Sequence, residues 1–258
     1  MRFFIVLLVL LLPPNSFAGE QPKKLTEIIQ KRGNSKTKIS EEIASQRINA
    51  IRNVAYSLGI QSAAKWRYEQ IEKVLESKKQ NLNRIYSFDL LLLGNNVLPP
   101  VIIESSGSFL VEDKIAVKTD KSFKIIKEAR IVSNPPSWRD YLLQEFEVKP
   151  VDSILYPRTD EEIDVWESTV KKGWALGVRQ ADRVFSINLR KLTRDMRGMI
   201  LFSFLSGQGL VSLPQVATDT YAIRVGKTTL DLGQKSFKLV VPSHFQGEEK
   251  WKPFQMSP

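Results

Sequence analysis

The sequence of 258 residues contains no cysteine and only one histidine, His244. Without cysteine, neither a disulfide nor a Cys-based zinc or iron-sulfur site can form, so packing alone has to hold the core. A single histidine excludes His-rich metal sites and makes any Ser-His-Asp arrangement depend on that one residue. We interpret His244 as a surface or capping residue, and we expect neither a metal nor a cofactor.

Long apolar runs are also absent, apart from one at the start of the chain, over residues 3–12. This run follows one basic residue and precedes two prolines and a small-x-small sequence that ends at Ala18, the pattern of a cleavable signal peptide over residues 1–18. A run of about ten residues is half of what spans a bilayer, so we expect an exported, soluble, periplasmic chain. An uncleaved anchor or a buried first helix is the alternative.

The composition is typical of a globular protein, since 42% of the residues are hydrophobic and 26% are charged. The formal net charge of +10 favours an acidic partner, such as nucleic acid, an anionic lipid headgroup or an acidic protein surface. For an exported protein, envelope components are the more natural of these partners.

Hydrophobic periodicity predicts an α+β fold, with long amphipathic helices packed with short antiparallel β-elements. We expect a flexible tether over residues 19–39, which are rich in lysine and polar residues, and one α+β domain over residues 40–258. Within this domain the expected segments are helical at 40–84, a small strand element at 97–118, helical at 120–209 and a β-meander at 211–242. The first helical segment is either one long helix or two helices end to end, with the bend at Gly59 if there are two. Thr159 and Glu162 form a capping-box pattern that predicts the start of a helix, and nothing interrupts the pattern before Gly207 and Gly209, which predicts a length of close to fifty residues.

One face of this long predicted helix is basic. At 100° per residue, six side chains fall within a sector of roughly 60°, opposite the apolar face. Most of them are arginines, which suit planar, bidentate contact with carboxylates, so we interpret the face as a protein-interaction surface; a solvated face is the alternative. The six residues are Lys172, Arg179, Arg183, Arg190, Arg194 and Arg197.

Small residues recur four apart in both long helical segments, where they would let two backbones approach closely. We therefore predict that the two helices cross at these positions, although a coincidental spacing is the alternative. The residues are Ala55, Gly59 and Ala63 in the first segment and Gly173, Gly177 and Ala181 in the second.

No catalytic motif is complete. Gly226, Lys227 and Thr228 imitate the end of a phosphate-binding loop, but the required earlier glycine is missing and a strand pattern follows. A carboxylate pair for glycan cleavage is defined in space rather than in sequence, so the spacing of acidic residues does not single one out. We name no catalytic residue and expect no small-molecule substrate.

Several strings, in the same order, resemble the DotC family of the Dot/Icm type IVB secretion system, which has TraI-like relatives in IncI-type conjugation. The resemblance covers about residues 45–253. Its strings are AKWR at 64–67, LLLGNNVLPPV at 91–101, NPPSWRDYL at 134–142, GWALGVRQAD at 173–182, DMRGMIL at 195–201, VSLPQVAT at 211–218 and WKP at 251–253.

The resemblance implies a non-enzymatic structural subunit of the core complex, associated with the outer membrane and working with DotD-like and DotH-like subunits. It implies that the subunit helps place the DotH-like protein at the outer membrane, and that nucleic acid is met only as transported cargo. DotC proteins carry their lipid on a cysteine, which this sequence lacks, so we expect indirect membrane association. The alternatives are a periplasmic cell-wall enzyme and a basic module that binds an envelope polyanion or DNA.

Overall fold

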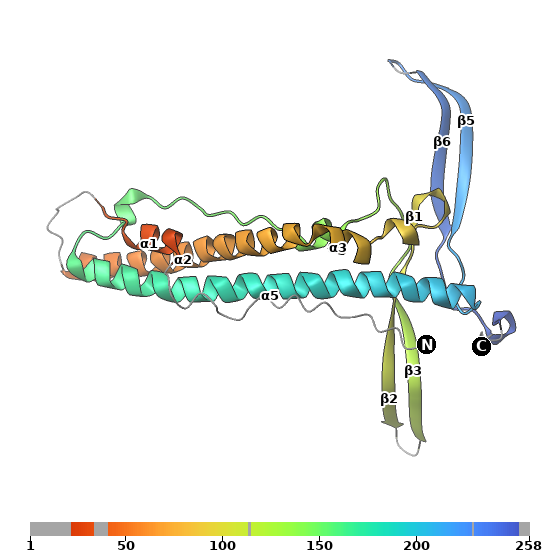
Figure 1. Cartoon of the computed structure of the whole chain (residues 1–258), viewed down its shortest axis with the longest axis horizontal. Coiled ribbons are helices and arrows are strands. Elements are labelled where there is room, and N and C mark those ends of the chain that lie inside the picture. The colour runs from red at the N-terminus through yellow and green to blue at the C-terminus, as the bar shows by residue number, and fades with distance from the viewer. Residues whose placement is uncertain (1–21, 34–40, 113–114, 229, 253–258) are drawn as a thin grey trace. The chain divides into compact units, whose positions relative to one another are not determined.

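The computed structural model describes residues 22–33, 41–112, 115–228 and 230–252 (Figure 1). The expected signal peptide, residues 1–18, lies outside these described residues. The chain forms two compact units instead of the single domain expected over 40–258: unit 1 is Met1–Glu69 with Glu145–Asp182, and unit 2 is Gln70–Gln144 with Arg183–Pro258. Two helices are long enough to contribute residues to both units, because a helix of 48 residues extends about 70 Å, beyond the reach of one small core.

Unit 1 contains helix α1 (Lys23–Ile29) and the first parts of α2 (Glu41–Ser77) and α5 (Asp160–Gly207). The predicted tether over residues 19–39 is wrong where the structure describes it, because α1 lies there. Leu25 and Ile28 of α1 are three residues apart and both are buried in the core of unit 1. The Trp166 indole N–H also donates to the Ile28 carbonyl at 3.0 Å, which holds α1 in place.

The two long helices follow their sequence patterns closely, with one difference. α5 begins where the Thr159 hydroxyl accepts the backbone N–H of Glu162 at 3.3 Å, and it continues for 48 residues. α2 is continuous through Gly59, so the proposed bend at this glycine is wrong; the helical segment is instead interrupted between Ser77 and the start of α3 (Lys79–Ile85). A short 3-10 turn, η3 (Ser153–Leu155), interrupts the otherwise extended segment before α5.

Unit 2 contains three antiparallel strand pairs among its described residues. It also holds the 3-10 turns η1 (Asp89–Leu91), η2 (Gly94–Asn96) and η4 (Glu248–Lys250), and the helix α4 (Trp138–Leu142). The strand pairs are β1 (Val97–Leu98) with β4 (Arg130–Ile131), β2 (Val101–Glu112) with β3 (Ile115–Lys127), and β5 (Gln215–Val225) with β6 (Leu230–Val241).

The structure differs from two of the predicted segments, those over residues 120–209 and 211–242. The helical segment expected over 120–209 is wrong outside α4, the turn η3 and α5, because β3 continues to Lys127 and β4 follows it; Phe123 and Ile125 alternate along β3 and pair with Glu104 and Ile102 of β2. The β-meander expected over 211–242 is a single hairpin. Gly233 lies inside β6 with φ of 67°, a backbone conformation that glycine adopts without steric cost.

The core of unit 2 gathers where α5 meets the start of β2. Ile102, Phe202 and Leu205 are buried together there with Val211. Gly198 permits this approach, since a Cβ at this position would lie 2.7 Å from the Ile102 carbonyl oxygen.

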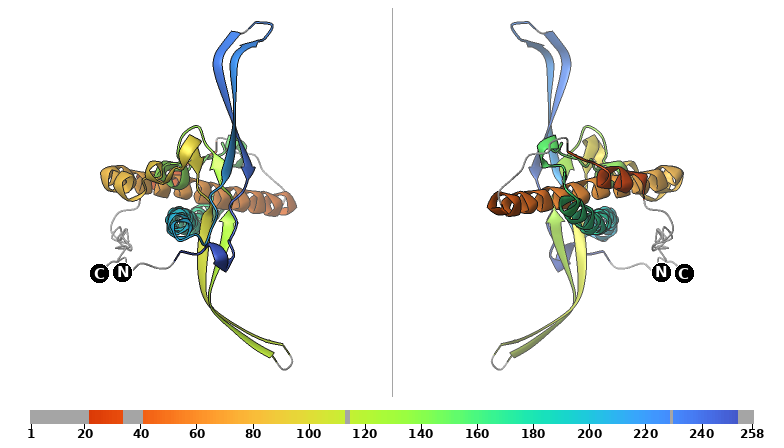
Figure 2. Two further views of the ribbon diagram at one scale, coloured as in Figure 1. Left: turned by 90° about the vertical axis from the view of Figure 1, so that its right-hand side faces the viewer. Right: turned by 90° about the vertical axis from the view of Figure 1, so that its left-hand side faces the viewer.

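The two long hairpins are narrow two-stranded ribbons (Figures 1 and 2). In the described part of the chain, neither ribbon pairs with a third strand, so each has two free edges. Among the helices of the described residues, none is both long enough and apolar enough to span a membrane.

Candidate functional site

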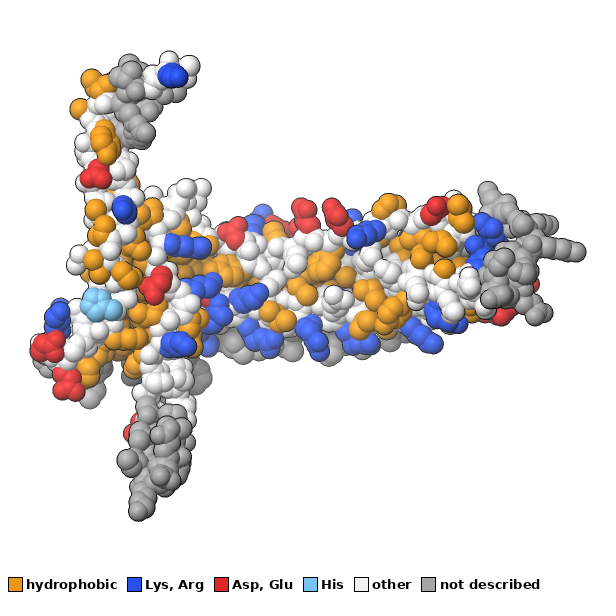
Figure 3. Space-filling model, turned by 180° about the vertical axis from the view of Figure 1, so that it is seen from behind, with side chains coloured by type: hydrophobic (Ala, Val, Ile, Leu, Met, Phe, Trp, Pro, Cys, Tyr) orange, Lys and Arg blue, Asp and Glu red, His pale blue; other side chains and the backbone are white. Residues whose placement is uncertain are grey.

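All six residues of the predicted basic face lie on α5, and all six side chains are exposed. Lys172 and Arg179 belong to the part of α5 in unit 1. The part in unit 2 carries Arg183, Arg190, Arg194 and Arg197. Figure 3 shows how often Lys and Arg side chains recur on the surface of the helical segments.

Within the basic face, the guanidinium of Arg194 binds the next residue along the chain. Its Nε and Nη2 atoms donate to Oδ1 of Asp195 at 2.9 and 2.7 Å. The helical spacing predicts that Arg194 is available to a partner protein as part of the basic face. The structure shows that much of its hydrogen-bonding capacity is used within unit 2.

Asp195 is the centre of a polar cluster in unit 2. Its side chain is fully buried, its Oδ2 atom accepts the Lys127 ammonium of β3 at 2.5 Å, and it also accepts the Tyr141 hydroxyl of α4 at 3.0 Å. Burial alone would raise the pKa of Asp195, but the hydrogen bonds from Lys127 and Arg194 outweigh burial and lower it. The carboxylate is therefore ionised at neutral pH and joins β3, α4 and α5.

The pKa of Tyr141 is shifted in the opposite direction to that of Asp195. Burial and the nearby Asp195 charge raise the pKa of the Tyr141 hydroxyl well above its ordinary value, so this group stays a neutral donor. The Tyr141 ring also stacks on Phe88, with ring centroids 5.8 Å apart. Tyr141 of the NPPSWRDYL string therefore has a structural role.

Other residues of that string hold α4 in place through their own contacts. The Trp138 indole N–H donates to Asn83 of α3 at 2.7 Å, and Arg139 pairs with Glu76 of α2 at 2.8 Å. The Asp140 carboxylate accepts the backbone N–H of Ser137 at 2.6 Å, which caps α4. Asp140 therefore has a structural role as a helix-capping residue.

The small residues of the predicted helix crossing lie together in unit 1. Ala55, Ala63 and Ala181 are fully buried. A Cβ at Gly59 would lie 2.7 Å from the Val170 carbonyl oxygen, and one at Gly177 would lie 2.8 Å from the Ala63 Cβ and also collide with the Ile60 carbonyl. A Cβ at Gly173 would meet the Tyr56 carbonyl in the same way, so α2 and α5 touch backbone to backbone here.

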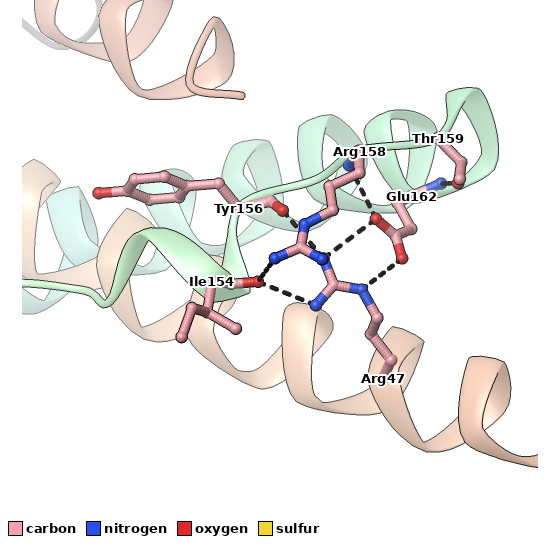
Figure 4. Close-up of polar contacts among 6 residues, drawn as sticks. All are labelled: Arg47, Ile154, Tyr156, Arg158, Thr159 and Glu162. Atoms are coloured by element: carbon pink, nitrogen blue, oxygen red, sulfur yellow. Dashed lines mark hydrogen bonds and ion pairs between the residues drawn. The ribbon is translucent and has the colours of Figure 1, made fainter. Parts of the chain in front are cut away.

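A second polar cluster lies in unit 1, beside the start of α5 (Figure 4). Arg47 of α2 pairs with Glu162 of α5, with Nε 2.7 Å from Oε1, and both side chains are nearly buried. Arg47 also donates to the carbonyls of Ile154 and Tyr156 at 2.9 and 3.1 Å, so it ties the extended segment before α5 to α2. Burial would raise the pKa of Glu162, but hydrogen bonds from Arg47 and from the Arg158 backbone lower it.

The side chains with catalytic potential have local structural contacts. Ser212 Oγ lies 2.9 Å from His244 Nδ1, but it also accepts the His244 backbone N–H at 3.0 Å, in a clasp between the segments that flank the β5–β6 hairpin. Glu104 pairs with Lys121 across the β2–β3 hairpin at 2.8 Å. Among the residues the structure describes, no group of His, Asp and Glu has the arrangement of a metal site.

Exposed apolar side chains accompany the arginines of unit 2, a feature that sequence reasoning missed. On α5, Ile187, Ile200 and Phe204 are 37%, 44% and 52% exposed. Phe204 continues the seven-residue spacing of Arg183, Arg190 and Arg197, and this spacing could have revealed it. Large apolar side chains are also exposed in and beside the β5–β6 hairpin, namely Leu213, Val240, Phe245 and Trp251, and Figure 3 shows hydrophobic side chains next to the single histidine.

The fold and this site define an α+β protein whose buried charges fasten its helices and whose exposed helix face is basic and apolar. Over residues 45–253 the chain matches the TraI family, described as type IV secretory system, conjugal DNA-protein transfer. The chain belongs to this family and is a component of that kind of transfer system. No curated protein matches the chain.

Proposed function

We propose that this chain is a non-enzymatic structural subunit of a type IVB secretion or conjugal transfer core complex, at the periplasmic side of the outer membrane. Its partners are DotD-like and DotH-like subunits, and it assists the outer-membrane placement of the DotH-like one. The family match carries this proposal, because it covers residues 45–253 and so includes most of both units.

The contacts of the described residues support a scaffold. The acidic side chains of Asp195 and Glu162 bind basic side chains from other segments and hold helices and strands together. Arginines and large apolar side chains remain exposed on one helix, which is the composition of protein interfaces. Such a subunit works by presenting surfaces in a fixed arrangement.

Membrane association is proposed to be indirect, since the sequence contains no cysteine that could carry a lipid. The test is fractionation of the tagged full chain in cells that contain or lack the DotD-like and DotH-like subunits. We expect it to pellet with the outer membrane only when the partners are present. Equal pelleting without them contradicts the proposal.

A matched variant separates export from assembly in that experiment. Leu7→Arg places a charge inside the apolar run of residues 3–12 and is expected to keep the chain in the cytoplasm. Export that is unchanged in this variant contradicts the assignment of the signal peptide. Release of soluble fragments from peptidoglycan by the purified protein would contradict the non-enzymatic role.

The net charge of +10 favours one second candidate, a module that binds an envelope polyanion or the transported DNA. Such binding falls steeply as salt rises, because each neutralised phosphate releases counterions. Weaker binding after substitution of Arg183 and Arg190, with a shallower salt dependence, would identify this function.

A further inference from the structure

The part of α5 in unit 2 presents one exposed face that mixes arginine with large apolar side chains. We call it the arginine-apolar face, and it consists of Arg183, Ile187, Arg190, Arg197, Ile200 and Phe204. Arg194 is left out because its guanidinium binds Asp195. None of the six side chains belongs to the buried core of unit 2.

The spacing along this face is that of a helix-packing seam. Arg183, Arg190, Arg197 and Phe204 are seven residues apart, while Ile187 and Ile200 lie four and three residues after members of that series. Residues at these intervals lie along one side of a helix, where a second helix can pack over several turns. From residue 183 to 204 the face extends about 32 Å along the helix axis.

The positive charge of the face is not balanced by a free carboxylate within residues 183–207 of the same helix. Between residues 183 and 207, α5 contains one carboxylate, Asp195, and its side chain is fully buried and already bound to Lys127 and Arg194. An acidic partner would supply the missing charge. A second copy of this chain is a poor fit, since each copy has a net charge of +10.

The residue types favour a protein partner over DNA. All three basic residues of the face are arginine, whose planar guanidinium binds carboxylates and phosphates alike in a bidentate manner, so the apolar side chains have to decide between partners. The exposed Ile200 and Phe204 add apolar area at the same spacing, which a partner helix can cover and a phosphate backbone cannot.

We propose that the arginine-apolar face of α5 receives an acidic amphipathic helix from a neighbouring subunit of the transfer complex. Its carboxylates pair with Arg183, Arg190 and Arg197, and its apolar side chains cover Ile187, Ile200 and Phe204. This inference rests on the proposed function, because it names the chemistry of a partner that a scaffold subunit would bind.

The test measures binding of the full chain to four probes: a synthetic acidic amphipathic helical peptide, a scrambled peptide of identical composition, phosphatidylglycerol vesicles and duplex DNA. The amphipathic peptide is expected to bind about tenfold more tightly than the scrambled one, because only it aligns charge and apolar area. The double variant Arg190→Glu/Arg197→Glu and the variant Phe204→Ala are each expected to weaken this binding by about tenfold.

Lys191→Glu is the matched control, because it makes the same charge change one residue from Arg190 and about 100° around the helix. The affinity of this variant for the amphipathic peptide should stay within about twofold of the wild-type affinity. Equal binding of the two peptides, an equal loss in Lys191→Glu, or tight binding only to the vesicles or to DNA would overturn the proposal. Circular dichroism of each variant confirms that the long helices are intact.

A transfer assay in cells separates this inference from the proposed function. Deletion of the chain stops transfer if the chain is a core subunit. Restoration of transfer by Arg190→Glu/Arg197→Glu to the wild-type level would overturn the docking face and leave the scaffold function standing. Unchanged transfer after deletion would instead contradict the proposed function itself.

Discussion

The Tyr141 hydroxyl donates a hydrogen bond of 3.0 Å to the fully buried carboxylate of Asp195. Through this contact, α4 is joined to α5, and the same carboxylate also holds Lys127 of β3. A buried carboxylate is stable only while its hydrogen-bonding partners remain in place. Asp195 is therefore a junction where three elements of unit 2 depend on one another.

Asp195→Asn is expected to destabilise the protein by about 2 kcal/mol, because Lys127 and Arg194 lose their counter-charge. The loss is smaller than for a completely buried pair, since both basic side chains are partly exposed to solvent. Urea unfolding followed by circular dichroism measures it. The control is Glu167→Gln, which removes an exposed pair with Lys171 and should cost less than about 0.5 kcal/mol. Equal losses in the two variants would contradict the role of Asp195 as a junction.

The same groups predict a dependence of stability on pH. The pKa values of Asp195 and Glu162 are lowered in the folded protein from ordinary values of 3.8 and 4.5, so their contribution is present above about pH 4.5 and is lost as the pH falls through the lowered values. The pKa of Tyr141 is raised from an ordinary value of 10.0, so its contribution is present below pH 10 and is lost as the pH rises further.

Unfolding free energies measured from pH 2 to 11 check this dependence, with the acid loss centred below pH 4. In Asp195→Asn the acid loss should be shallower, and in Tyr141→Phe the alkaline loss should be shallower. A Tyr141→Phe protein that loses stability above pH 10 as steeply as the wild type would show that another group is responsible.

Local patterns of the sequence predict the long helices well. The Thr159 and Glu162 pattern places the start of α5, and the recurrence of apolar residues covers α2. Patterns fail where a contact with another segment decides the structure. Asp120 is a residue type that suits the N-cap of a helix, but pairing with β2 makes residues 120–127 part of a strand.

The candidate site shows the same limit. Periodicity finds the exposure of Arg190 and Arg197, since a helix face follows from spacing alone. It does not reveal that Arg194 binds Asp195, because only the fold brings Lys127 and Tyr141 to that carboxylate and fixes its position. Buried charge clusters depend on contacts between distant residues, which one sequence does not display.

Gly177 tests the close approach of α2 and α5. Alanine within a helix is normally more stable than glycine by about 1 kcal/mol, but here a Cβ would collide with the Ile60 carbonyl and the Ala63 side chain. We expect Gly177→Ala to destabilise the protein by about 2 kcal/mol as the helices are forced apart. The control is Gly207→Ala, also in α5, where the added Cβ meets nothing within 4 Å. Gly207→Ala should be neutral or slightly stabilising, and the same result for Gly177→Ala would contradict the backbone contact.

Apolar side chains of the β5–β6 hairpin are exposed to solvent, so we expect them to contribute little to the free energy of unfolding. Ile223 is 62% exposed, whereas Phe202 in the core of unit 2 is fully buried. Ile223→Ser is expected to change the unfolding free energy by less than about 0.5 kcal/mol, while Phe202→Ala should cost about 3 to 5 kcal/mol through lost burial and a cavity. Thermal and urea unfolding of the purified protein measure both. An isolated two-stranded ribbon gains little stability from its own side chains in water, which is why we expect the small effect of Ile223→Ser. A large loss of stability in this variant would mean that the Ile223 side chain is covered in the folded chain. An unchanged stability would leave the side chain available for contacts with another protein.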